Sequence, residues 1–82
     1  MQIKILGTGC RKCNKLADAA NEAVKMSGMD AEVVKVEKIE EIMKYGIAMT
    51  PGLVFDEKVV STGKVPSPEK IASMIKEHSQ EK

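Results

Sequence analysis

The chain has 82 residues, 43% of them hydrophobic and 30% charged, which is the balance of an ordinary soluble globular domain. We expect one domain over residues 1–82, because so little apolar material cannot form a second core. No apolar stretch approaches the roughly 20 residues that a bilayer requires, so we expect no membrane partner. A net charge of +1, with one tyrosine and one phenylalanine, also argues against a nucleic-acid partner.

The first half of the chain alternates strand-like and helix-like patterns. A short apolar run at residues 2–6 predicts a strand buried on both faces. Residues 12–27 carry apolar side chains at helical spacing, and Gly28 is suited to end that helix. Valines at residues 31–36 predict a second strand. A strand, helix and strand of these lengths predict parallel pairing of the two strands.

A second helix is predicted over residues 37–45. It would place Ile39, Ile42 and Met43 on one face and end at Gly46.

The rest of the chain predicts a hairpin and a closing helix. Residues 53–55 and 58–61 flank a two-residue turn that lacks the favoured glycine. The last helix opens at Ser67 as N-cap, followed by a proline and an acid. We expect His78, near the end of this helix, to be solvated. The predicted fold is therefore α/β in the order βαβαββα, with a four-stranded mixed sheet and three helices.

The chemistry of the sequence lies in Cys10 and Cys13, a C-x-x-C pair between the first strand and the first helix. This edge of an α/β sheet is where ligands and reactive groups are placed. Helix N–H groups and the cationic Arg11 and Lys12 favour a thiolate, so we expect the pKa of Cys10 to lie below the free-thiol value of about 8.5. Cys10 would then attack a disulfide, and the less exposed Cys13 would resolve the mixed disulfide.

Three alternatives compete with this interpretation. The two cysteines can be small buried apolar residues. The chain can instead be a pure interaction domain in which the cysteine pair is incidental. The cysteines can also bind a soft metal, as in metal chaperones that carry C-x-x-C after a first strand. Zinc normally takes four ligands, and His78 is the one further soft candidate in the sequence. Such chaperones follow the order βαββαβ, which differs from the order predicted here.

The combination of C-x-x-C after the first strand, Thr50-Pro51 before a hairpin, and a helix after the hairpin resembles the thioredoxin and glutaredoxin superfamily. More narrowly, it resembles the small, thioredoxin-like redox-active disulfide proteins of methanogens and other anaerobes. The resemblance implies a thioredoxin-like fold and a thiol–disulfide oxidoreductase that uses the Cys10–Cys13 disulfide and no other cofactor. Its expected partners are protein disulfides and an unidentified reductase.

The resemblance also implies a substrate groove beside the cysteines. In that groove the Thr50–Pro51 bond is cis, and the Thr50 backbone pairs with a bound substrate strand. Gly63 matches the glycine turn that borders the groove, and Met49 can present a flexible apolar side chain there. Arg11 and Lys12 flank the same groove.

The chain departs from the better-known motifs of the superfamily at the cysteines. The tryptophan and proline of W-C-G-P-C and the proline and tyrosine of C-P-Y-C are absent. Two cysteines in so small a chain, with no secretory signal pattern at residues 1–6, lead us to expect a cytosolic protein. We also expect it to be a monomer.

Overall fold

The computed structural model describes residues 1–9, 11–47 and 49–80 of the chain. Its elements follow the predicted order βαβαββα. They are β1 (Gln2–Leu6), α1 (Arg11–Ser27), β2 (Glu32–Val36), α2 (Ile39–Lys44), β3 (Gly52–Phe55), β4 (Lys58–Thr62) and α3 (Pro68–Gln80). In the described part of the chain, no helix has the length and apolar character needed to cross a bilayer.

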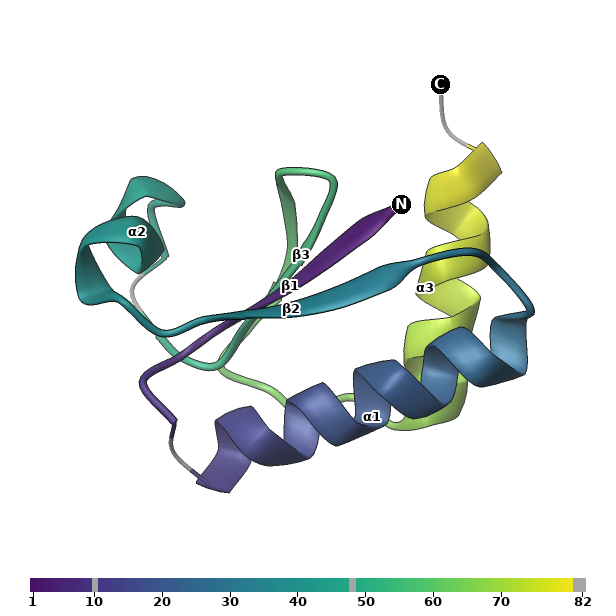
Figure 1. Cartoon of the computed structure of the whole chain (residues 1–82), viewed down its shortest axis with the longest axis horizontal. Helices are drawn as coiled ribbons and strands as arrows, with labels where there is room; N and C mark the ends of the chain where they lie inside the picture. The colour runs from purple at the N-terminus through teal and green to yellow at the C-terminus, as the bar shows by residue number, and fades with distance from the viewer. Residues whose placement is uncertain (10, 48, 81–82) are drawn as a thin grey trace.

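The four strands form one mixed sheet in the order β2-β1-β3-β4. β1 pairs with β2 in parallel, as predicted, and with β3 in antiparallel orientation, while β3 and β4 form the antiparallel hairpin. Helices α1 and α3 pack against each other on one face of the sheet, and α2 lies apart from them (Figure 1). The predicted α/β class, with a four-stranded mixed sheet and three helices, is confirmed.

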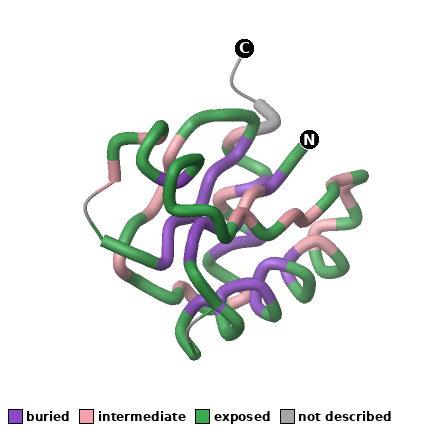
Figure 2. The backbone as a smooth tube through the Cα atoms, turned by 60° about the vertical axis from the view of Figure 1, so that its left-hand side comes forward, coloured by how far each residue is buried: buried purple, intermediate pink, exposed green. Residues whose placement is uncertain are grey.

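The main core lies between the sheet and the helix pair α1 and α3. Side chains at alternate positions of β1 and β3 meet small alanines of α1 and the apolar side of α3. Figure 2 shows the buried residues concentrated along the inner strands and on one side of α1. Fully buried members of this core include Ile3, Leu16, Phe55, Ile71 and Ile75. Because α1 enters this core directly, the core fixes the position of its first turn.

The opposite face of the sheet carries a smaller core beneath α2. Leu6 and Val54 are buried there against Ile42. The other two apolar residues of the predicted α2 face are not buried, since Ile39 is 62% and Met43 69% exposed. Tyr45 and Ile47, which follow this six-residue helix, are partly buried and pack against the same core.

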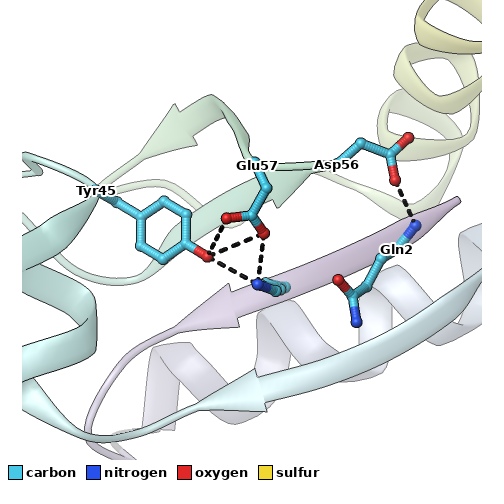
Figure 3. A network of polar contacts seen from close by, with 5 residues as sticks. Gln2, Tyr45, Asp56 and Glu57 are labelled. Carbon is cyan, nitrogen blue, oxygen red and sulfur yellow. Dashed lines mark hydrogen bonds and ion pairs between the residues drawn. The ribbon is translucent and has the colours of Figure 1, made fainter.

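The hairpin turn has two residues with positive φ and no glycine. Asp56 has a φ of 46° and Glu57 a φ of 72°, the backbone of a type I′ turn. Each side chain is tied to β1 (Figure 3). Asp56 Oδ1 accepts from the Gln2 backbone N–H at 2.8 Å, and Glu57 accepts from Lys4 Nζ. These bonds offset the conformational cost of a turn without glycine.

Lys4 is a charged residue in the central strand β1, and its hydrogen bonds account for that position. Its Nζ also donates to the Tyr45 hydroxyl at 2.9 Å, and that hydroxyl donates to Glu57 at 3.1 Å. The hydrogen bond to Glu57, followed by that to Tyr45, raises the pKa of Lys4 above its ordinary value. The same bond from Lys4 lowers the pKa of Glu57. The expectation that β1 is apolar on both faces is therefore wrong at Lys4, which is half-buried and paired.

His78 also differs from expectation. Its side chain is 18% exposed, its ring lies edge-on to Phe55 with centroids 5.6 Å apart, and its Nε2 is 3.2 Å from Asp56 Oδ2. The solvated helix-end position predicted for it is wrong, because α3 packs its last turns onto the hairpin.

Candidate active site

One edge of the sheet brings three chain segments together. The strand pairing places Leu6, at the end of β1, opposite Gly52, and Gly52 opposite Thr62, at the end of β4. The loop to α1 leaves this edge, and the segments before β3 and after β4 meet it. We call it the site edge. In Figure 1 the start of α1 and the segment after β4 lie on the lower side, opposite the hairpin turn and the N-terminus.

Cys13 lies in the first turn of α1 and is buried, with 4% of its surface exposed. Its side chain packs directly on Gly7. A methyl group at position 7 would overlap Cys13 Sγ and lie 3.0 Å from its Cβ. The Gly7 backbone N–H donates to Val36 O at 3.0 Å and so holds this glycine to the end of β2. The thiol of Cys13 is thus held between the end of β1 and the helix start.

The start of α1 is electropositive. Arg11 and Lys12 are exposed there, and the first turn of the helix contains no acidic residue. Helix N–H groups add a partial positive charge at this end. Cys10, the predicted nucleophile, precedes Arg11 in the sequence and lies outside the described residues, so its position and its lowered pKa stay predictions.

A small cavity of about 10 Å³, roughly the size of one water molecule, adjoins Cys13. Among its lining residues are Gly9, Lys35 and Glu37. Lys35 Nζ donates to Asn14 Oδ1 at 3.3 Å. Sequence reasoning missed Lys35 and Glu37, although both come at the carboxyl end of β2. Because β2 runs parallel to β1, that position already indicated the same edge.

The predicted groove residues Met49, Thr50, Pro51 and Gly63 come together at the site edge. The Thr50–Pro51 bond is cis, and Pro51 is buried. The Gly63 backbone N–H donates to Pro51 O at 2.8 Å. A methyl group at Gly63 would lie 3.2 Å from Met49 Cε and 3.4 Å from Met49 Cβ, so Met49 rests against this glycine. Met49 is nevertheless 63% exposed.

Within residues 1–9, 11–47 and 49–80, no group of three or more histidine, cysteine, aspartate or glutamate side chains is arranged to hold a metal ion. Cys10 lies outside these residues.

Comparisons with known proteins match nearly the whole chain. The family model described as the thioredoxin domain matches residues 1–76. The chain belongs to the thioredoxin family. It is 42% identical over 80 residues to a thioredoxin of Methanocaldococcus jannaschii, covering 98% of this chain and 92% of that protein. It is 40% identical over 75 residues to a thioredoxin of Methanothermobacter thermautotrophicus, covering 92% of this chain and 97% of that protein.

The resemblance stated from sequence is thereby confirmed, including the similarity to proteins of methanogens. Membership of the family supports, in general terms, a thiol–disulfide oxidoreductase.

Proposed function

We propose that this family member reduces and re-forms disulfides of other proteins through the pair Cys10 and Cys13. The observation that carries the proposal is the burial of Cys13 against Gly7 at the start of α1. Since Cys10 precedes Cys13 by three residues in the sequence and comes directly before Arg11, the first residue of α1, we expect it at the same helix end. A protected thiol beside a second thiol at a helix N-terminus suits thiol–disulfide exchange.

The reaction proceeds in two exchanges. The Cys10 thiolate attacks one sulfur of the substrate disulfide, which forms a mixed disulfide and releases the other substrate sulfur as a thiolate. Cys13 then gives up its proton and attacks the Cys10 sulfur, which closes the Cys10–Cys13 disulfide and releases the second substrate thiolate. The substrate gains two electrons and the protein loses two. A reductase returns the protein disulfide to the dithiol.

The groove beside the cysteines would hold the substrate chain. Thr50 is exposed at the edge of the sheet, and its backbone is proposed to pair with an extended substrate segment. Met49 and Gly63 would border that segment, with the Met49 side chain providing an adaptable apolar contact. Arg11 and Lys12 would flank it from the start of α1.

The alternative of a soft-metal chaperone is less well supported. A helix, α2, precedes the hairpin and another, α3, follows it, which is the arrangement expected for the oxidoreductase. The finding that supports the oxidoreductase over the chaperone is the family match over residues 1–76.

The proposed roles are tested by separating the two cysteines. In Cys13→Ser, Cys10 can still attack the substrate disulfide, but no second thiol resolves the mixed disulfide. We therefore expect a stable mixed disulfide between Cys10 and the substrate, and no turnover. Cys10→Ser should neither trap nor turn over, and it serves as the matched control. Disulfide reduction by Cys13→Ser at the wild-type rate would refute the assignment.

The ionisation of Cys10 has its own measurement. Ultraviolet absorbance of the thiolate, followed against pH in the Cys13→Ser variant, should give a pKa below about 8.5. A value at or above that of a free thiol would contradict it.

The expected setting of this activity is a reducing compartment, where thiols are kept reduced. We therefore propose a cytosolic monomer that uses no cofactor beyond its own disulfide.

A further inference from the structure

The site edge carries cationic side chains from the starts of two helices and from the segment that follows β4. Arg11 and Lys12 open α1, while Lys64 follows β4 and Lys70 lies in the first turn of α3. All four residues are exposed. None of their side chains forms a hydrogen bond or ion pair with another residue of the part that the structure describes. We call these four residues the basic rim.

Few carboxylates balance the basic rim. Glu69 lies beside Lys70, and Glu37 lies beside Gly9, where a methyl group would be 3.3 Å from its Oε2. The side of the molecule away from the site edge is different, since strand starts, the hairpin turn and the helix ends gather acidic residues there. In the described ranges these are Asp30, Glu32, Asp56, Glu57 and Glu77, alongside Lys25, Lys58 and Lys76.

With Lys4 included, the charges of that far side nearly cancel, whereas the basic rim leaves an excess of positive charge at the site edge although the net charge of the chain is only +1. Lys4 and Glu57 pair with each other, and Asp56 pairs with His78. Lys58 and Lys76 each have an interaction partner as well. Among the described residues, no hydrogen bond or ion pair neutralises the side chains of the basic rim. Their positive charge is therefore available to another molecule.

A pocket adjoins the rim on the side of α3. It has a volume of about 360 Å³, and Lys64 and Lys70 line it together with the apolar side chains of Val60, Val65, Pro66 and Met74. This combination fits a polypeptide that presents an apolar side chain next to carboxylates. The lining residues Ser61 and Lys64 lie on either side of Gly63 in the chain, and Gly63 borders the proposed groove.

We propose that the basic rim selects disulfide partners whose surface around the reactive sulfurs is acidic, with an apolar side chain seated between β4 and α3. This inference rests on the proposed function and names the partner class for the same site. Oppositely charged surfaces accelerate encounter by 10-fold or more at low ionic strength, and salt weakens that effect. We therefore expect the basic rim to change the relative rates at which different partners are reduced, and not the rate of disulfide exchange itself.

The test uses two disulfide-linked synthetic peptides that differ only in the residues flanking the cysteine, glutamates in one and lysines in the other. Both carry one leucine. The reduced wild-type protein should reduce the glutamate peptide about tenfold faster at low salt, and the difference should shrink as salt is added. The rate of reduction of bis(2-hydroxyethyl) disulfide, which is neutral, measures disulfide exchange in the absence of charge attraction.

The variants leave the cysteines and their neighbours unchanged. Lys64→Glu/Lys70→Glu should lose the preference for the glutamate peptide while reducing the neutral disulfide at the wild-type rate. Lys25→Glu/Lys58→Glu changes net charge equally on the far side and should keep the preference. If charge reversal impairs folding, Lys64→Gln/Lys70→Gln should still lower the preference.

Each failure has a distinct signature. The acidic partner class would be overturned if the wild-type protein reduced the two peptides at equal rates. It would also be overturned if Lys64→Glu/Lys70→Glu and Lys25→Glu/Lys58→Glu lost the preference for the glutamate peptide equally. Either result would leave the oxidoreductase proposal intact. No reduction of the neutral disulfide would instead overturn the proposed function, and the partner inference with it.

Discussion

Gly7 leaves the space that the Cys13 side chain occupies. A methyl group at position 7 would overlap Cys13 Sγ, so the buried thiol and the glycine are packed as one unit. Gly7→Ala is therefore expected to displace Cys13, to destabilise the fold by about 1–3 kcal/mol and to slow disulfide reduction. Urea unfolding and a reductase assay measure the two effects.

A double-mutant cycle separates this contact from general damage at position 7. With Cys13→Ala in the background, the sulfur is gone and Gly7→Ala should cost markedly less free energy of unfolding. An unchanged cost in the two backgrounds would show that the effect of Gly7→Ala does not pass through Cys13.

Gly63 supports Met49 at the border of the proposed groove. Gly63 has a φ of +69°, and an added methyl group would press on Met49. Gly63→Ala should raise the KM for a protein disulfide about fivefold, equivalent to about 1 kcal/mol. The rate with a small neutral disulfide should not change.

Gly46→Ala is the matched control, because Gly46 has a φ of +70° and nothing within 4 Å of an added methyl group. Both substitutions carry a similar backbone cost of about 1–2 kcal/mol. If both raise KM alike, backbone strain accounts for the effect and the contact with Met49 does not.

Asp56 makes stability depend on pH in the acid range. The hydrogen bond from the Gln2 N–H, with a smaller contribution from His78, lowers the pKa of this carboxyl below its ordinary value of 3.8. A lowered pKa in the folded state adds stability above about pH 4, and that stability is lost as the pH falls through the folded value. Acid titrations of unfolding should therefore show a steeper loss in the wild type than in Asp56→Asn.

Asparagine is the informative substitution at position 56. It tolerates the positive φ of 46° and keeps an oxygen for the Gln2 N–H, so it removes the titration while preserving the turn. An identical pH profile for wild type and Asp56→Asn would rule out Asp56 as a source of the acid sensitivity.

Glu57 sits at the second position of the turn with a φ of 72°. Glu57→Gly and Glu57→Ala both remove the contacts to Lys4 and Tyr45, but only alanine retains the steric cost of a positive φ. Glu57→Gly should therefore be more stable than Glu57→Ala by about 1 kcal/mol, measured by urea unfolding. The reverse order would mean that the turn changes shape in the variants.

The elements of this fold could be predicted closely because each has a local cause. Helix α1 begins and ends within one residue of the predicted range, since apolar spacing and Gly28 act within the helix itself. The α3 N-cap is also as predicted, with Ser67 Oγ accepting from the Lys70 N–H at 3.2 Å. Exposure of Ile39 and Met43 was not predictable in this way, because it depends on how much of α2 the sheet can cover.

The sequence by itself determined which reactive groups the protein has: a C-x-x-C pair, cationic neighbours and a Thr-Pro before a hairpin. The tertiary structure alone decided which other residues surround that chemistry. Parallel pairing of β1 and β2 brings Lys35 and Glu37 to the cavity beside Cys13, and packing of α3 on the hairpin buries His78 against Phe55. Such contacts join residues that are far apart in the chain. Local sequence patterns do not predict them, because they depend on strand pairing and helix packing in the folded protein.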